Sequence, residues 1–196
     1  AEANRVSAEK TLELAKMNLN KIMGRSLTAP LELTTTFTYT PSDIPDVEEM
    51  VKSALALRPE VISIRETKEV AELNCKLALK YYAENTFVYR KAKIDLEKAV
   101  LGVKEAEDQI SLAVRSAHYA VIEAAEKLKS AEKAKETAQE VYRITDLKYK
   151  SQVATMADVL SAMENLRQAE LAYTSSVFDY NVARAQLDNW AGNGLE

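Results

Sequence analysis

The chain has 196 residues, a net charge of −4 and a sequence pI of about 5.3. No cluster of Lys and Arg stands clear of acidic neighbours, so the charge pattern gives no reason to expect nucleic-acid binding. The single Cys75 cannot form an internal disulfide, and no stretch approaches the roughly 18 consecutive apolar residues of a membrane-spanning helix.

The first predicted element is a helix over residues 1–23. Apolar or small residues recur on one face of it, at Leu12, Ala15, Leu19 and Ile22. Gly24 follows directly and suits the left-handed position that ends many helices. Because the chain begins at Ala1 rather than Met, we expect either a removed leader or a fragment of a longer protein.

Residues 24–58 are predicted to form a small mixed segment. Three of the four prolines fall in its first part, which favours irregular backbone. The stretch 31–39 alternates in part and is rich in Thr, so one short strand is expected there. A short helix over 46–57 is then predicted, because Asp46 precedes Glu49 by three residues, as in a capping box.

Three longer helices follow. Pro59 suits the first turn of a helix that is predicted to run to about Ala83. After a joint at 83–87, a long helix is predicted from about Val88 to about Lys150, and a last helix from 155 to 191. Residues 103–191 contain neither Gly nor Pro. Their apolar and small residues step by three and four, which indicates the heptads of a left-handed coiled coil.

The predicted lengths suggest how these helices pack. The long helix of about 63 residues would measure roughly 94 Å, and the helices at 59–83 and 155–191 together have nearly the same length. We therefore predict an all-α fold, an elongated antiparallel coiled-coil bundle in which one helix faces two shorter helices placed end to end. Residues 1–196 would form a single elongated domain, with the equatorial segment 24–58 beside the joint.

An internal repeat supports this organisation. A shift of 168 positions gives seven identities among residues 1–27, and the spacing Leu-x4-Gly ends both copies, at Gly24 and Gly192. This pattern indicates that the chain begins near the end of one repeat and finishes at the same point of the next. We expect most of a first repeat to be missing.

Four segments in this order resemble the TolC-like outer-membrane efflux protein family. They are Leu19–Gly24 with Ala29–Leu33, the run ALALRPEV at 54–61, the turn Tyr149-x5-Thr155-x-x-Asp158-Val-Leu160, and Tyr180-Asn-x-Ala183-x3-Leu187-x4-Gly192. The resemblance implies trimers whose helices, here 59–150 and 155–191, form the wall of a periplasmic α-barrel. It implies docking to a periplasmic adaptor protein and an inner-membrane efflux or ABC transporter, and a place in the periplasm and cell outer membrane.

The sequence departs from the family in two places. The family would place membrane-spanning strands between Tyr82 and Arg90, where this chain has too few residues for a hairpin of such strands. The first repeat also lacks its long helix. A natural relative without a barrel and a trimmed fragment are both open explanations.

The resemblance implies an entrance at Asp158, Tyr149 and Thr155. In a trimer, Asp158 would form a ring of three carboxylates that attracts cations; alternatively Thr155 and Asp158 form a capping box. Tyr149 matches a tyrosine that helps to close the family's entrance, although its expected partners are replaced by Ala154 and Ser161 and the usual turn glycine by Gln152. Otherwise Tyr149 is an aromatic residue of the helix seam.

The turn that joins the last two helices is the candidate contact with the adaptor, against the alternative of a plain solvated turn. It comprises Lys150, Ser151, Gln152, Val153 and Ala154. We find no pattern for catalysis, a cofactor or a metal: His118 is the lone histidine, and nucleotide-binding and nucleophile motifs are absent from the sequence. The sequence therefore predicts a non-enzymatic wall component of a trimeric efflux or type I secretion duct. The alternative is a stand-alone coiled-coil scaffold or adaptor hairpin without a conduit.

Overall fold

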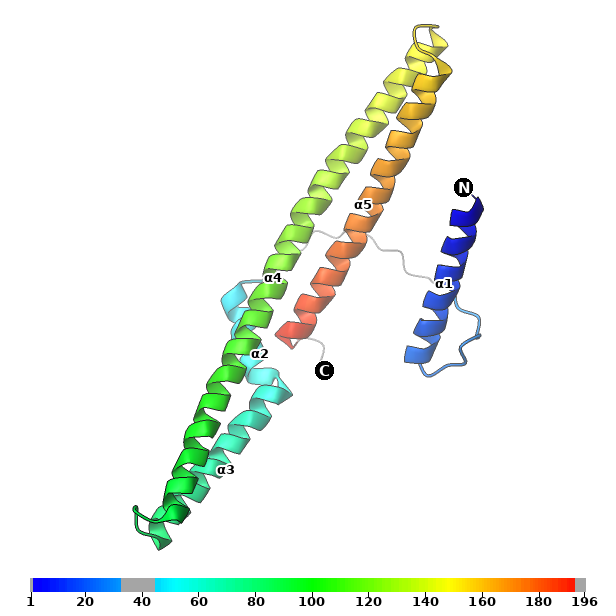
Figure 1. Ribbon diagram of the computed structural model, residues 1–196. Coiled ribbons are helices and arrows are strands. Elements are labelled where there is room, and N and C mark those ends of the chain that lie inside the picture. The colour runs from blue at the N-terminus through cyan, green and yellow to red at the C-terminus, as the bar shows by residue number, and fades with distance from the viewer. Residues whose placement is uncertain (1, 33–44, 193–196) are drawn as a thin grey trace. The chain divides into compact units, whose positions relative to one another are not determined.

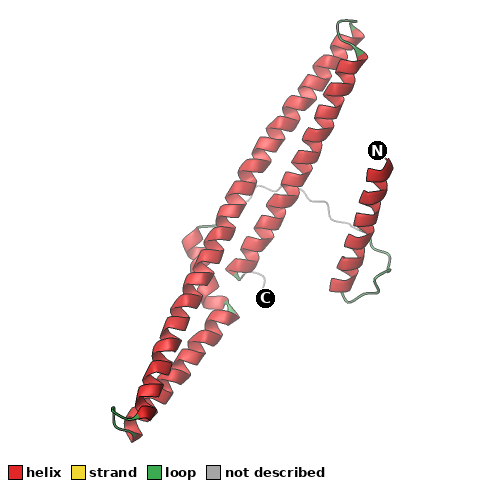
Figure 2. Ribbon diagram, viewed as in Figure 1, coloured by secondary structure: helices red, strands yellow, loops and turns green. Residues whose placement is uncertain are grey.

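The computed structural model describes residues 2–32 and 45–192, and the chain divides into two compact units, Ala1–Thr38 and Tyr39–Glu196. Every regular element among the described residues is an α-helix, which confirms the all-α class (Figure 2). The strand predicted over 31–39 falls mostly within 33–44, outside the described residues. The single domain over 1–196 stays a prediction, and each unit is described by itself.

The first unit contains helix α1, Glu2–Ile22. Gly24 follows it with φ +68°, and the N–H groups of Gly24 and Arg25 donate to the carbonyls of Lys21 and Asn20 at 3.1 and 2.8 Å. This pair of bonds is a Schellman ending, and it confirms Gly24 as the left-handed residue that stops the helix. The buried side-chain amide of Asn20 donates to the carbonyls of Leu27 and Ala29, so the next loop is fastened to the helix end.

The second unit consists of four helices around the longest one. They are α2 (Val47–Leu57), α3 (Pro59–Tyr81), α4 (Phe87–Lys150) and α5 (Met156–Ala191). Helix α4 packs against the other three, and α2 contacts both α3 and α5 as well. Figure 1 shows α3 along the N-terminal part of α4 and α5 along its C-terminal part.

The continuity of α4 is the prediction on which the rest of this unit depends. Its 64 residues form one uninterrupted helix of roughly 96 Å, which confirms the long helix predicted from about Val88 to about Lys150. Helices α3 and α5 have 23 and 36 residues. The predicted bounds differ most at the end of α3, two residues earlier than expected, because Tyr82 takes extended angles (φ −131°, ψ 143°).

Local capping residues explain where these helices begin. Asp46 caps α2 as predicted, but its carboxylate accepts from the N–H of Glu48 rather than of Glu49. Pro59 lies in the first turn of α3, where a missing N–H costs no helical hydrogen bond. The hydroxyl of Thr86 accepts from the N–H of Tyr89 at the start of α4.

The core lies where α2, α4 and α5 meet. Its members are largely Val, Leu and Ala, and they are Met50, Val51, Ala54, Val114, Val121, Ala124, Leu128, Val177, Tyr180, Ala183, Leu187 and Ala191. The alanines bring the helix axes close together, and the larger side chains fill the spaces between them. Two ion pairs also reach α4: the guanidinium of Arg115 lies 2.9 Å from the Glu48 carboxylate, and that of Arg65 lies 2.7 Å from Glu107.

Candidate functional site: the turn between α4 and α5

The turn that closes the α4–α5 hairpin has a defined backbone geometry. The N–H of Gln152 donates to the carbonyl of Tyr149 at 2.9 Å, and the N–H of Val153 donates to that of Lys148 at 2.8 Å. These two bonds again form a Schellman ending, with Gln152 as its left-handed residue at φ +61°. The last carbonyls of α4 are therefore satisfied within the turn itself.

Gln152 is the one described residue other than glycine with a positive φ. A left-handed conformation costs a residue with a Cβ atom roughly 1 kcal/mol or more relative to glycine. The resemblance had identified this same position as one where a glycine is usual. Backbone strain of this kind is more frequent at functional sites than elsewhere, which makes the turn the best candidate for a recognition surface.

Thr155 and Asp158 form a complete capping box at the start of α5, which confirms the capping interpretation. The Thr155 N–H and hydroxyl donate to the Asp158 carboxylate at 2.8 and 2.7 Å, and the Asp158 N–H donates to the hydroxyl at 3.3 Å. These hydrogen bonds hold the pKa of Asp158 below its ordinary value of 3.8. Its side chain is exposed, so a role at an entrance is compatible with capping and stays a prediction.

We expect Thr155→Ala to lower the free energy of unfolding by about 1 kcal/mol at neutral pH, because the N-cap hydroxyl is lost. Since the folded pKa of Asp158 is lowered, its stabilising contribution is present above about pH 4 and disappears as the pH falls through the folded value. Thr155→Ala removes the main cause of that lowered pKa. The variant should therefore lose less stability than the unmodified chain between about pH 5 and about pH 2.

Urea unfolding at a series of pH values measures both effects. Thr145→Ala is the matched control, because the Thr145 hydroxyl only donates to the carbonyl of Val141 within α4. It should leave both the stability and its pH dependence nearly unchanged. Equal acid sensitivity of Thr155→Ala and the unmodified chain would contradict the role given to the capping box.

Several apolar side chains are exposed around the turn, among polar and charged ones. Val153 is 76% exposed, and Tyr149, Met156 and Leu160 are each about half exposed. Lys150 is also exposed and lies 2.7 Å from Asp146, whose carboxylate holds the pKa of Lys150 above its usual value. Exposed apolar side chains clustered at one end of a hairpin are typical of a surface that contacts another protein.

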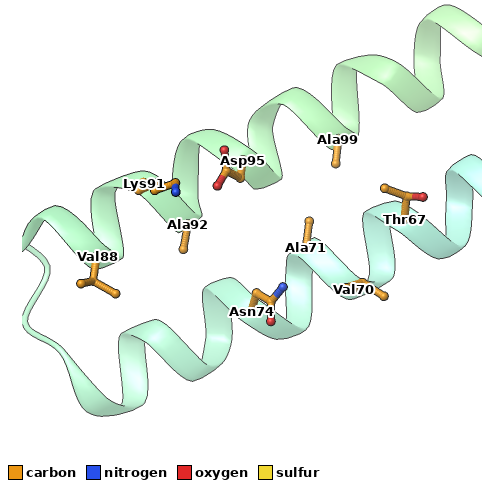
Figure 3. A pocket seen from close by; sticks show the side chains of 9 residues that line it. All are labelled: Thr67, Val70, Ala71, Asn74, Val88, Lys91, Ala92, Asp95 and Ala99. Carbon is orange, nitrogen blue, oxygen red and sulfur yellow. The ribbon is translucent and has the colours of Figure 1, made fainter.

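A shallow groove between α3 and α4 is lined mainly by Ala and Val, with single Thr, Asn, Lys and Asp side chains (Figure 3). Within the described parts of the chain, no three His, Cys, Asp or Glu residues are grouped to hold a metal ion. None of the described helices is long and apolar enough to cross a membrane.

A second site was missed by the sequence analysis. Arg58 enters the sequence analysis only as part of the run 54–61, and the structure shows that its guanidinium donates to the carbonyls of Asn189 and Trp190 at the end of α5. The contact joins residues more than 130 positions apart. The available signals were an Arg placed directly before the Pro of a helix start and a lone Trp near the end of the last helix.

No family model matches this chain, and no curated protein matches its sequence. The likeness to TolC-like proteins therefore rests on the four sequence segments, and the function that it implies is a proposal.

Proposed function

We propose that this chain is a wall component of a trimeric outer-membrane efflux or type I secretion duct, built as an antiparallel coiled-coil bundle. The observation that carries the proposal is that α3, α4 and α5 each have a second apolar stripe. In each helix this second stripe lies on nearly the opposite side of the helix from the residues that pack within the chain. A wall of helices requires this arrangement, since each helix there has a neighbour on either side.

Helix α5 has the second stripe most clearly. Its buried residues include Val177, Tyr180 and Leu187, which lie in the core where α2, α4 and α5 meet. A separate set of apolar residues is between 37% and 57% exposed: Leu160, Met163, Leu171 and Val182. At about 100° per residue, this set is centred roughly 150° around the helix axis from the buried one.

Helices α4 and α3 repeat the pattern. In α4 the exposed residues Ile94, Leu101, Leu112 and Tyr119 are spaced by seven, eleven and seven positions. They lie roughly opposite the buried side that contains Val121 and Leu128. In α3 the exposed Ile62, Leu73 and Leu77 lie roughly opposite the buried side with Val61 and Ala78.

Two apolar faces on one helix favour a wall over a stand-alone hairpin. A surface helix with a single packed neighbour has one apolar stripe, and its remaining sides are polar. A second stripe left in water would be an association surface. Copies of the chain placed side by side would cover it, and a closed ring of copies would leave no stripe exposed at its edges.

The turn between α4 and α5 supplies the docking end of the proposed duct. Its exposed Tyr149 and Val153 would contact the periplasmic adaptor, and through it the inner-membrane transporter. The three copies of Asp158 would surround the entrance with negative charge, which attracts cations. This assignment places the protein in the cell envelope, between the periplasm and the outer membrane.

Sedimentation of the unmodified protein tests the proposal. We expect a trimer, and we expect the double substitution Leu160→Glu with Leu171→Glu to shift it to monomer, because two carboxylates would be buried between copies. The matched control is Ser161→Glu with Ala172→Glu, which adds the same charge at exposed positions outside both stripes. Electron microscopy of the trimer should then show a ring with an open interior.

A monomer at high protein concentration would contradict the wall. A two-stranded dimer without an interior would instead support the alternative, a coiled-coil scaffold or adaptor hairpin. The control variant guards against a general effect of added charge, since it should assemble like the unmodified chain.

A further inference from the structure

Arg58 carries a buried charge at the junction of α2 and α3. The residue is only 8% exposed, and it ends α2 while standing directly before Pro59. Its nearest carboxylate, that of Glu60, lies 3.5 Å away on a side chain that is mostly exposed. Because a buried guanidinium needs close hydrogen-bond partners, Glu60 alone does not explain the burial.

The partners of Arg58 are the last carbonyls of α5. Its Nε donates to the carbonyl of Trp190 and its Nη2 to that of Asn189, both at 3.2 Å. The guanidinium also lies 4.3 Å from the centre of the Trp190 ring, in a cation–π contact. The final carbonyls of a helix lack partners within the helix and form the negative end of its dipole, so a cation is favourable there.

Helix α5 has no basic residue of its own in its last turn. By contrast, α1, α3 and α4 each carry a lysine there. The positive charge that α5 lacks is therefore supplied by a residue distant in the sequence. The end of α5 and the end of α2 also approach each other closely: a Cβ atom built on Gly192 would lie 3.4 Å from Cβ of Leu57.

We propose that Arg58 is a latch that positions the C-terminal end of α5 on the α2–α3 junction. Helices α3 and α5 pack on successive parts of α4, and core side chains such as Leu187 hold the C-terminal half of α5 against α2 and α4. The latch adds a hold on the last backbone carbonyls of α5, so that α5 ends at the point where α3 begins. The inference rests on these contacts and is independent of the proposed duct.

Trp190 is the only tryptophan, so its fluorescence reports directly on this junction. Arg58→Ala should shift Trp190 emission to longer wavelength, because the ring loses the guanidinium that covers it and becomes wetter. Hydrogen exchange of the backbone amides at 185–191 should accelerate roughly ten- to thirty-fold, as the last turns of α5 open locally. Exchange in the middle of α4 should stay as in the unmodified protein.

Arg65→Ala is the matched control. Arg65 lies in α3, close to the same junction, and its guanidinium donates to Glu107 of α4 and to the carbonyl of Leu55 in α2. Among the described helices, α3 packs against α2 and α4 and not against α5. Loss of the Arg65 side chain should leave Trp190 emission and exchange at 185–191 unchanged. Arg58→Gln, which keeps one donor but no charge, should show a partial effect.

The latch is contradicted if Arg58→Ala matches the unmodified protein in both readouts, or if Arg65→Ala changes them equally. Far-UV circular dichroism checks that the variants are folded. Should Arg58→Ala unfold entirely, the milder Arg58→Gln decides: accelerated exchange confined to the end of α5 supports the latch, and unchanged exchange there overturns it.

Discussion

Leu187→Ala should lower the free energy of unfolding by about 2–5 kcal/mol, the range observed when a buried leucine is truncated. Leu187 has no exposed surface and lies in the core where α2, α4 and α5 meet. The substitution removes buried apolar surface and leaves a cavity that surrounding helices can fill only in part. Urea unfolding followed by circular dichroism measures the change.

Leu147→Ala is the control for that measurement, because it makes the same chemical change at a side chain that is about half exposed. It should change the free energy of unfolding by no more than about 0.5 kcal/mol, as is usual at the surface. If the two variants were equally stable, Leu187 could not be part of the packed core described above.

Ala124→Pro should be at least as damaging, with a loss of about 3 kcal/mol or more. Ala124 lies in the middle of α4 and within the core. A proline there removes one backbone hydrogen bond and clashes with the preceding turn, so the helix that carries both α3 and α5 would kink. Reduced helical signal and a lower urea midpoint are the expected results.

Met156→Pro provides the contrast within the same hairpin. Met156 is the first residue of α5, and Thr155 before it already has the extended angles (φ −89°, ψ 163°) that a following proline requires. The variant should fold with nearly unchanged stability, since no helical hydrogen bond is lost at this position.

A full-length, stable α4 in Ala124→Pro would contradict the continuous packing of the second unit.

The helices could be predicted because their causes are local. A helix needs a suitable start, such as Thr155 with Asp158, and freedom from Gly and Pro, as in residues 103–191. The stop at Gly24 is equally local, since a residue without a Cβ atom takes the left-handed angles at little cost. The predicted bounds of the helices therefore agree with the structure within about two residues.

The candidate site was predicted in part for the same reason. The capping box of Thr155 and Asp158 depends on residues three positions apart, so its pattern is visible in the sequence. The left-handed conformation of Gln152 was harder to predict. Only the resemblance indicated a turn position where glycine is usual, and no property of Gln itself favours that conformation. The contacts of Arg58 could not be predicted, since periodicity says nothing about which distant carbonyls a buried arginine will reach.

The sequence by itself determined that this chain is helical, where its helices begin and end, and that one of them is long enough to face two others. The tertiary structure decided which face of each helix is inside. In α5, the stripe with Tyr180 and Leu187 and the stripe with Leu160 and Leu171 are both apolar, so hydrophobicity alone does not distinguish them. Only packing against α2 and α4, and the latch at Arg58, buries the first and leaves the second on the surface, because burial depends on which side chains fit together in space.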